Sequence, residues 1–288
     1  MLSKFALRVK RYVETNKLLS ANGLYLVALS GGSDSVALLR VMIDLGYRIE
    51  AMHCNFHLRG EESDRDEAFC ENLCAEQNVP FHRIHFDTKT YAALHKVSIE
   101  MAARELRYNY FEKLRVDLAA DAILVAHHRD DSVETLLINL IRGTGLHGLQ
   151  GISCKNGFII RPLLDVSRID IIDYLNDTKQ KFVTDSSNNI DDVTRNKIRL
   201  NIIPLLNKIN PSASADIAKT ANRIRQAACI FDEAIKKSVN EVVVKKTDSC
   251  ICIDLAKLKS MVSSEYILYS IIHDYSFSPS QIEQISEN

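Results

Sequence analysis

Short, wholly apolar runs alternate along the chain with longer segments in which apolar residues recur every three or four positions. Leu24 to Leu29 is the first such run, and a Ser- and Gly-rich loop leads from it into the spaced apolar residues Val36 to Ile43, which end at Gly46. Runs that are apolar throughout are typical of strands buried on both faces, and spacings of three and four are typical of helices. This part of the chain is therefore predicted to form strand, loop and helix in that order.

The same alternation continues to residue 141. The remaining predicted elements are strands at 48–53, 81–86 and 122–126, and helices capped at Ser63 and Asp64, at 99–118 and at 133–141. Strands that alternate with helices form a parallel sheet covered on both faces. We therefore expect an α/β fold with a doubly wound, mostly parallel, Rossmann-like sheet. Its ligand site should lie beyond the carboxyl ends of the strands.

The pattern changes in the last third of the chain. From Asp216 onward, apolar residues recur at spacings of four and three in one long helix, followed by a hairpin around 247–249 and one or two more helices. We therefore expect a catalytic domain at 1–212, and a linker helix with a smaller, mainly helical domain at 213–288. No closing element is recognisable at 286–288, as expected of a truncated chain.

Composition excludes some classes of protein. The chain is 46% apolar and 25% charged, which is typical of a globular protein with one sizeable core and a smaller unit. No apolar stretch approaches the roughly 18 to 20 residues that span a bilayer. Charges at Lys4 and Arg8 also interrupt the region where a secretory signal needs an unbroken apolar run. We therefore expect a cytoplasmic protein with no membrane partner.

Charge is distributed unevenly although the whole chain carries only −1. Eleven Lys and Arg residues and four Asp and Glu residues lie between Arg195 and Lys246, so this segment carries +7 and the remainder −8. Such asymmetry fits a polyanion-binding extension on an acidic catalytic domain. A solvated helix surface would produce the same pattern.

The seven cysteines are odd in number and scattered, which does not indicate a disulfide framework, and we expect them to be reduced. Cys70 and Cys74 would share one helix face, and Cys250 and Cys252 would alternate along a strand. Neither spacing is that of a zinc ribbon or a redox pair. All four are expected to be small buried apolar residues.

The loop after the first strand is the strongest candidate for a binding site. It consists of Ser30, Gly31, Gly32, Ser33, Asp34 and Ser35. Glycines let the backbone approach a ligand, and the following helix directs free N–H groups and its positive dipole end at the loop, which suits a polyphosphate. The lysine of the usual phosphate loop is missing, and Asp34 makes sense beside phosphates if Mg²⁺ lies between them. The alternative is a Gly-rich turn with a Ser or Asp helix cap.

This loop resembles the signature of the N-type ATP pyrophosphatases, which cleave ATP between the α- and β-phosphates and adenylate their substrate. Further segments between about residues 20 and 200 are similar to one branch of that family, the tRNA(Ile)-lysidine synthetases. These segments are His53 to Gly60, Glu62 to Asp64, Ala102 to Arg104 with Arg107 and Tyr108, His127 to Asp131 with Glu134 and Thr135, Asn139 with Arg142 to Gly145, Arg161 to Leu164, and Asp185 to Asn188 with Arg195, Asn196 and Arg199. The resemblance is weaker beyond Ile217.

The resemblance implies a fold of the adenine nucleotide alpha hydrolase type and a ligase that forms a carbon–nitrogen bond. Such enzymes use ATP and Mg²⁺ to adenylate the C2 carbonyl oxygen of the wobble cytidine of tRNA(Ile) with a CAU anticodon. The side-chain amine of free L-lysine then displaces AMP, which produces lysidine. The small domain at 213–288 would bind tRNA, family members often have a further carboxyl-terminal domain, and the sequence allows a homodimer.

Candidate roles follow for the residues that match the family's motifs. The ATP phosphates would be bound by Ser30, Gly31, Gly32, Ser33 and Ser35. Asp34 would position Mg²⁺ and belong to the catalytic set. Arg104 would meet the α-phosphate or the developing negative charge, because its guanidinium keeps its proton, although it could also be an exposed helix arginine.

Acidic and histidine side chains are the next candidates. Asp130, Asp131 and Glu134 would bind the ammonium groups of lysine or a second Mg²⁺, with Asp130 also in the catalytic set. Alternatively, Asp131 and Glu134 form a helix-capping pair. His53, assigned to ATP, and His127, assigned to catalysis, would contact ATP or accept the proton of the attacking amine, or else be structural histidines.

Basic residues late in the chain are the candidates for tRNA binding, where phosphate contacts supply affinity without sequence discrimination. They are Arg195, Arg199, Lys219, Arg223 and Arg225. Arg142 to Gly145 would form a turn that closes a helix and would also approach tRNA.

Three other functions share parts of this pattern. A tRNA thiolation enzyme has the same loop, but it needs closely spaced reactive cysteines, and the chain has no CxxC pair. A small-molecule synthetase of the same fold does not explain the basic extension. A regulator that holds ATP or AMP without turnover does not need Asp34 together with the acidic cluster at 130–134.

Overall fold

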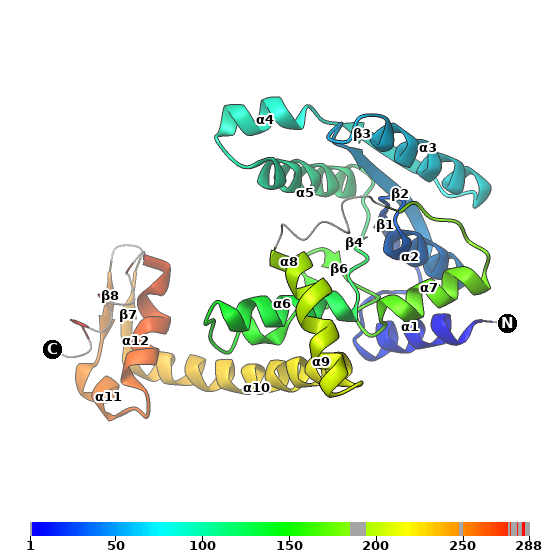
Figure 1. Cartoon of the computed structure of the whole chain (residues 1–288). Helices are drawn as coiled ribbons and strands as arrows, with labels where there is room; N and C mark the ends of the chain where they lie inside the picture. The colour runs from blue at the N-terminus through cyan, green and yellow to red at the C-terminus, as the bar shows by residue number, and fades with distance from the viewer. Residues whose placement is uncertain are drawn as a thin grey trace. The chain divides into compact units, whose positions relative to one another are not determined.

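The computed structural model describes residues 2–184, 194–247, 250–275, 277, 281, 284 and 285. The chain divides into two compact units, unit 1 at 1–144 and 148–221 and unit 2 at 145–147 and 222–288 (Figure 1). The boundary predicted from the sequence lies at the first residue of helix α10 (Ala213–Val242), whereas the structure divides this helix between the two units.

Unit 1 is built on a six-stranded sheet with the strand order β3-β2-β1-β4-β6-β5. The strands are β1 (Leu24–Ala28), β2 (Arg48–Asn55), β3 (Phe81–His85), β4 (Ala122–Leu124), β5 (Lys155–Asn156) and β6 (Ile159–Ile160). Every neighbouring pair is parallel except β5 with β6. The winding reverses beside β1, since β2 and β3 follow on one side and β4 on the other. In open sheets of this kind, ligands bind at such a point.

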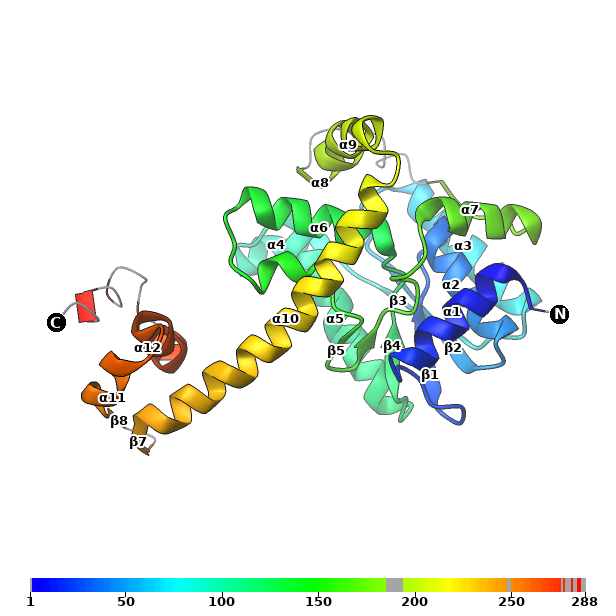
Figure 2. The ribbon, with the colours of Figure 1, turned by 90° about the horizontal axis from the view of Figure 1, so that it is seen from below.

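The position of strand β1 between two hydrophobic cores explains why its sequence is apolar throughout. Tyr25 and Val27 belong to one hydrophobic cluster, and Leu24 and Leu26 belong to another, so successive side chains enter cores on opposite faces of the sheet. Helices α1, α2 and α7 contact one another on the first face (Figure 2). Phe111 of α5 lies in the second core. The predicted mostly parallel sheet with flanking helices is confirmed.

The helices of unit 1 account for most of its remaining residues. They are α1 (Lys4–Thr15), α2 (Ser33–Asp44), α3 (Glu61–Glu76), α4 (Thr88–His95), α5 (Ile99–Asp117), α6 (Arg129–Ile141), α7 (Arg168–Asp177), α8 (Thr194–Lys197) and α9 (Ile203–Ile209), with a π-helical turn at Ile198–Ile202. Helix α1 was not predicted from the sequence, where its residues were considered only as a signal sequence. The helix presents Phe5 to Tyr174 of α7, with ring centroids 4.4 Å apart.

The predicted cap of helix α3 is wrong. Ser63 and Asp64 lie inside the helix, and Gly60 precedes its first residue with φ 53°. A positive φ favours glycine, so the turn at Gly60 sets the start of the helix. The Ser63 hydroxyl accepts a hydrogen bond from the N–H of Arg59 at 3.2 Å.

Unit 2 has a small core of its own. After α10 it contains an antiparallel hairpin of β7 (Val243–Lys246) and β8 (Ile251–Ile253), followed by α11 (Leu255–Ser260) and α12 (Ser264–Ile272). The predicted hairpin and following helices are therefore present. The buried residues of this core are Val242, Leu258, Ile267, Leu268 and Ile271. No helix of the described residues in either unit is long and apolar enough to cross a bilayer.

The two cysteine pairs considered in the sequence differ in their exposure. Cys70 and Cys74 are fully buried on one face of α3, as predicted. Cys250 and Cys252 are exposed, which corrects the prediction that they are buried. The small hairpin covers only one of its faces, so alternation along β8 leaves the Cys252 side chain on the open face.

Candidate functional site

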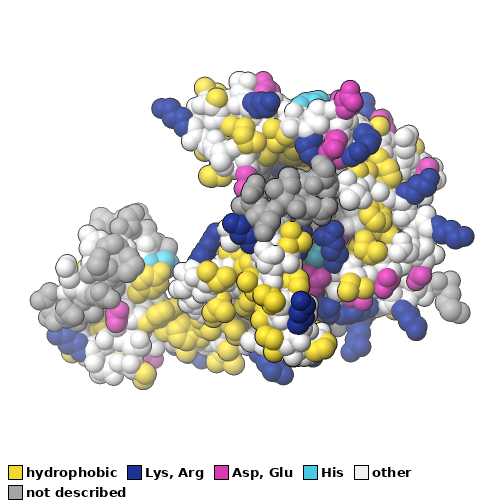
Figure 3. All heavy atoms as spheres, viewed as in Figure 1, with side chains coloured by type: hydrophobic (Ala, Val, Ile, Leu, Met, Phe, Trp, Pro, Cys, Tyr) yellow, Lys and Arg dark blue, Asp and Glu magenta, His cyan; other side chains and the backbone are white. Residues whose placement is uncertain are grey.

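A cavity of about 510 Å³ lies at the carboxyl ends of β1, β2 and β4, and α5 forms one of its walls. This volume is within the range of small-ligand sites. Acidic, basic and histidine side chains meet in the middle of unit 1 (Figure 3). The polar residues that line the cavity are Ser30, Asp34, Ser35, His53, Glu100, Arg104, Arg107, Tyr108, His127, Asp131 and Arg195. Polar residues at the ends of β1, β2 and β4 thus meet in one place, where a ligand site was expected.

The loop between β1 and α2 is fixed by its own side chains. Gly32 precedes α2 and provides no side-chain cap, so the predicted Ser or Asp cap is not formed. Ser35 Oγ instead donates to the carbonyl of Gly32 at 3.0 Å and accepts from the N–H of Ser30 at 3.1 Å. Gly31 adopts φ 88°, and its carbonyl accepts from the N–H of Val183 at 2.9 Å. The first N–H groups of α2 therefore lie beside the cavity without a side-chain cap.

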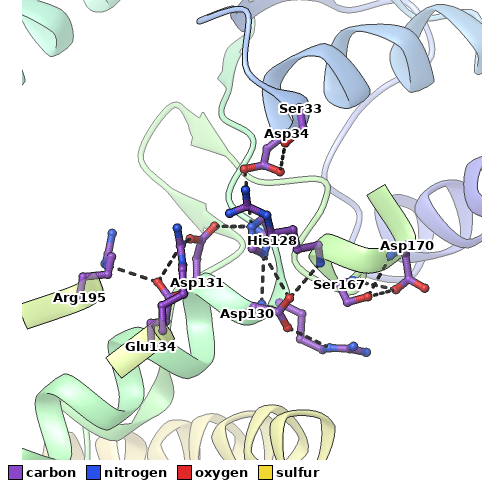
Figure 4. A network of polar contacts seen from close by, with 12 residues as sticks. Ser33, Asp34, His128, Asp130, Asp131, Glu134, Ser167, Asp170 and Arg195 are labelled. Atoms are coloured by element: carbon purple, nitrogen blue, oxygen red, sulfur yellow. Dashed lines mark hydrogen bonds and ion pairs between the residues drawn. The ribbon is translucent and has the colours of Figure 1, made fainter. Parts of the chain in front are cut away.

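Asp34 and His128 face each other across the site (Figure 4). The hydroxyl of Ser33 donates to Asp34 Oδ1 at 3.1 Å. His128 is buried, and its Nδ1 accepts from the backbone N–H of Asp130 at 3.2 Å, so the proton of a neutral ring is on Nε2. That Nε2 atom lies 3.7 Å from Asp34 Oδ2 and 3.5 Å from Asp131 Oδ2. From the sequence, His128 belonged only to a matching segment and had no predicted role.

His53 is held by the main chain. Its side chain is buried, and its Nδ1 lies 2.8 Å from the carbonyl oxygen of Leu29. A carbonyl oxygen only accepts, so Nδ1 is the donor and Nε2 of the neutral ring keeps its lone pair. Burial lowers the pKa of His53, so the ring is neutral near pH 7.

His127 is held by a side chain. Nε of Arg161 donates to Nδ1 of His127 at 3.0 Å, and Nη1 of the same guanidinium donates to the carbonyl of Ser153 at 2.7 Å. Burial lowers the pKa of His127 to about 4, assisted by the nearby charges of Arg161 and Arg195. From the sequence, Arg161 belonged only to a matching segment and had no predicted role.

Asp131 and Glu134 of α6 meet Arg199. Nη2 of Arg199 lies 3.2 Å from Asp131 Oδ1, and its Nε lies 2.6 Å from Glu134 Oε1. Burial raises the pKa of Glu134, and the hydrogen bonds from Arg199 act in the opposite direction. The predicted capping pair of Asp131 and Glu134 is wrong. Asp131 caps the helix together with His128, whose N–H donates to Asp131 Oδ2 at 3.0 Å. Glu134 takes no part in that cap.

Asp130 is turned towards another element. Its Oδ2 accepts from the backbone N–H of Arg168 at 2.9 Å, at the start of α7, and the residue does not line the cavity. This position favours a role in joining α6 to α7. The assignment of Asp130 to catalysis or lysine binding stays a prediction.

Among the predicted cationic ligands, Arg104 and Arg195 reach the cavity. Arg104 is exposed on α5, with its guanidinium carbon 5.0 Å from the centre of the Tyr108 ring. Arg195 Nη2 donates to Thr135 Oγ1 at 3.2 Å. Lys219 of unit 1 forms an ion pair with Asp216 at 3.0 Å.

The other predicted site residues belong to unit 2 or to residues that the structure does not describe. Arg223 and Arg225 belong to unit 2, and their contact with tRNA stays a prediction. The matching segment at 185–188 lies outside the described residues.

The fold and this site define a class of protein. The chain belongs to the PP-loop domain family, whose model matches residues 1–206. A model of the TilS substrate binding domain matches residues 246–288. The predicted resemblance is confirmed by curated relatives, among them the tRNA(Ile)-lysidine synthases of Bacteroides thetaiotaomicron and Parabacteroides distasonis.

The relatives are similar over nearly the whole chain. The Bacteroides protein is 49% identical over 281 residues, which is 98% of this chain and 65% of the relative. The Parabacteroides protein is 51% identical over 269 residues, or 93% of this chain and 60% of the relative. The chain thus spans about 60 to 65% of the length of these relatives.

A solved structure also has a similar fold. It is a U34-tRNA thiolase from Methanococcus maripaludis, described with its 4Fe–4S cluster. The TM-score is 0.61 at 18% identity, and the match covers 76% of this chain and 78% of the thiolase. At this identity the similarity shows the fold alone.

Proposed function

We propose that this chain catalyses the reaction of a tRNA(Ile)-lysidine synthase, with ATP, free L-lysine and a CAU-anticodon tRNA(Ile) as substrates. The observation that carries the proposal is that proteins of this name match 93 to 98% of the chain at 49 to 51% identity. One cavity is also lined by Ser30, Asp34 and Ser35 of the phosphate loop and by Arg104 and Asp131. These groups suit the binding of phosphates and of an amine.

In the first step, the O2 atom of cytosine attacks the α-phosphorus of ATP. The O2–phosphorus bond forms, and the bond from this phosphorus to the oxygen bridging to the β-phosphate breaks, so that pyrophosphate leaves with the electron pair. The uncapped N–H groups of α2 and the hydroxyl of Ser30 would bind the phosphates. Arg104, which also lines the cavity, would neutralise charge on the α-phosphate.

Asp34 fits a Mg²⁺ ion that arrives with ATP. Mg²⁺ is usually held by one or two carboxylates together with substrate phosphates. Asp34 lines the cavity beside the phosphate loop. Among the described residues, no group of three or more His, Cys, Asp and Glu side chains forms an all-protein metal site. When bound there, Mg²⁺ would neutralise charge on the departing pyrophosphate.

In the second step, the side-chain amine of lysine attacks C2 of the adenylated cytosine. The C2–N bond forms and the C2–O bond breaks, so that AMP leaves with the electron pair. The proton of the amine passes to the departing phosphate or to solvent water. Asp131 and Glu134 would bind ammonium groups of lysine. Both carboxylates contact Arg199 in the structure, so the incoming cation would compete with this guanidinium.

Binding of tRNA would use the basic residues late in the chain. Arg195 is half exposed at the cavity, and Lys219, Arg223 and Arg225 lie farther along the sequence. Such contacts would hold the RNA backbone and carry no base specificity. A cytoplasmic location and a homodimer are part of the same proposal.

A thiolation reaction is the less favoured alternative. Cys54 is the cysteine that lines the cavity in the described part of the chain. Burial raises its pKa to about 12, so it is a thiol at neutral pH and not the nucleophilic thiolate.

Product analysis with the full chain tests the proposed function. The reaction would contain ATP, Mg²⁺, labelled lysine and unmodified tRNA(Ile) with a CAU anticodon, and parallel reactions would omit lysine or tRNA. We expect AMP and pyrophosphate only with tRNA, and label in RNA only in the complete mixture. Formation of ADP, or of AMP without tRNA, would contradict the proposal.

A matched pair of variants distinguishes the loss of a carboxylate at the site from the general effect of losing one negative charge. Asp34→Asn removes the carboxylate beside the phosphate loop, and Asp173→Asn removes an exposed carboxylate of α7. We expect the first variant to lose AMP formation and the second to keep it. Equal activity of the two variants would rule out the assignment of Asp34.

A further inference from the structure

The hydrogen bond between Arg161 and His127 restricts what the histidine can do. Guanidinium nitrogens carry protons and have no acceptor lone pair, so they only donate. The 3.0 Å contact from Nε of Arg161 therefore uses the lone pair of His127 Nδ1. The single proton of the neutral imidazole must then be on Nε2.

The sheet builds this contact. His127 follows β4, Arg161 follows β6, and the two strands are parallel neighbours joined by the bond from the N–H of Val125 to the carbonyl of Ile160 at 3.0 Å. Arg161 is 8% exposed and is anchored a second time by the carbonyl of Ser153. A buried guanidinium with two fixed acceptors cannot easily turn away from the imidazole.

The surroundings favour the neutral form of this ring. Burial is the main cause of the lowered pKa of His127, and the charges of Arg161 and Arg195 act in the same direction. Asp131 is the opposing charge. A neutral ring with its proton on Nε2 is a hydrogen-bond donor and has no free lone pair with which to accept a proton.

We propose that Arg161 is a positioning residue that fixes His127 as the neutral Nε2–H tautomer, so that His127 donates a hydrogen bond to a reacting phosphate oxygen and accepts no proton. This inference rests on the proposed function for the identity of the reaction. No bond to His127 forms or breaks in either step. A donor fixed before the reaction stabilises charge that develops in the transition state without reorganisation. The proton of the attacking amine goes to the departing AMP phosphate or to solvent water.

The tautomer can be measured without turnover. The full chain, labelled with ¹⁵N in its histidines, would be studied by long-range ¹H–¹⁵N NMR at neutral pH, and the His127→Gln variant would identify the signals of His127. We expect a protonated Nε2 and an unprotonated Nδ1. A protonated Nδ1, or an imidazolium at neutral pH, would overturn the inference whatever the chain catalyses.

A variant of Arg161 connects the tautomer to the reaction. Arg161→Leu removes the donor, and we expect the Nδ1–H form of His127 to become populated, with roughly tenfold slower AMP formation and an unchanged KM for ATP. Arg8→Leu is the matched control, because Arg8 also joins two elements, through Asp165 at 2.8 Å, without contacting His127. It should leave the tautomer and the rate unchanged.

The outcomes separate the inference from the proposed function. A wild-type chain that forms no lysidine but has the Nε2–H tautomer would contradict the proposed function and keep the assignment of the tautomer. A chain that forms lysidine with a protonated Nδ1 would contradict the inference alone. An unchanged tautomer and rate in a folded Arg161→Leu variant would also overturn it.

Discussion

The two histidines on either side of β1 differ in the direction of their hydrogen bonds. His53 belongs to β2 and His127 follows β4, and both line the same cavity. The Nδ1 atom of His53 faces the carbonyl of Leu29, which only accepts, and that of His127 faces Arg161, which only donates. The free Nε2 atoms are therefore an acceptor on the β2 side and a donor on the β4 side.

This difference teaches that residue type and position do not determine the chemistry of a histidine. The atom that is hydrogen-bonded to Nδ1 determines whether Nε2 is a donor or an acceptor. The partner of His53 is a main-chain atom, and no substitution of a side chain removes it. The partner of His127 is a side chain, so the role on the β4 side is the one that a single substitution changes.

The largest expected effect is on the rate of AMP formation when His127, the proposed donor, is replaced. His127→Ala should slow AMP formation about 10²- to 10³-fold, as the loss of one fixed donor does in other sites. His127→Gln should lose much less, because its amide can still donate, and a base would not be replaced by an amide. His95→Ala, which changes an exposed histidine of α4, is the control. Equal losses in the Ala and Gln variants would contradict the donor role.

The next largest effect is on the pH dependence of the free energy of unfolding. The pKa of His127 is about 4 in the folded chain against 6.5 for the free side chain, so the unfolded chain binds more protons between these values. The free energy of unfolding should therefore fall as pH falls from about 6.5 to 4, by about 2 kcal/mol for this partly buried ring. Denaturant titrations at several pH values measure it. His127→Gln should have a shallower slope, and an identical slope would show that other groups cause the loss.

Gly31, in the loop that follows strand β1, is expected to give a smaller effect. Alanine at φ 88° should cost roughly 1 to 2 kcal/mol and lower Tm by about 2 to 8 °C. Its Cβ would also lie 3.4 Å from Cys70 Sγ. Gly46→Ala is the control, because φ is 77° there and no atom lies within 4 Å of the new Cβ. Only the Gly31 variant should also raise the KM for ATP, and a raised KM in both would remove the distinction.

The smallest effect is expected on the KM for ATP when His53, the acceptor, is replaced. His53→Ala removes one acceptor from the cavity, so the KM for ATP should rise roughly 3- to 10-fold, the value of about one hydrogen bond, with kcat nearly unchanged. His82→Ala on β3, where the ring contacts Glu50 at 2.7 Å, is the control. A loss in kcat as large as that of His127→Ala would mean that the two histidines do not differ in role.

Much of the fold could be predicted because its signals are local. The apolar run at 24–29 and the spacing at 36–43 predict β1 and α2, since burial of side chains on one or two faces leaves a periodic record in the sequence. Helix α1 escaped prediction because a short amphipathic segment at the start of the chain was considered only as a targeting signal.

The site could be predicted as a set of residues but not as a set of contacts. Arg161 meets His127 over 34 residues, and Arg199 meets Glu134 over 65 residues, so no local spacing reveals either pair. The sequence likewise left His53 and His127 indistinguishable. Their partners are brought to them by the order of strands in the sheet.

Nucleoside analysis of the reacted tRNA tests the central claim most directly. Unmodified CAU-anticodon tRNA(Ile) would be incubated with the full chain, ATP, Mg²⁺ and isotopically labelled lysine, then digested and separated by mass. The account predicts labelled lysine joined to the wobble cytidine, and no such product when ATP is omitted. An unmodified wobble cytidine in the complete reaction, or label attached at another position, would contradict it.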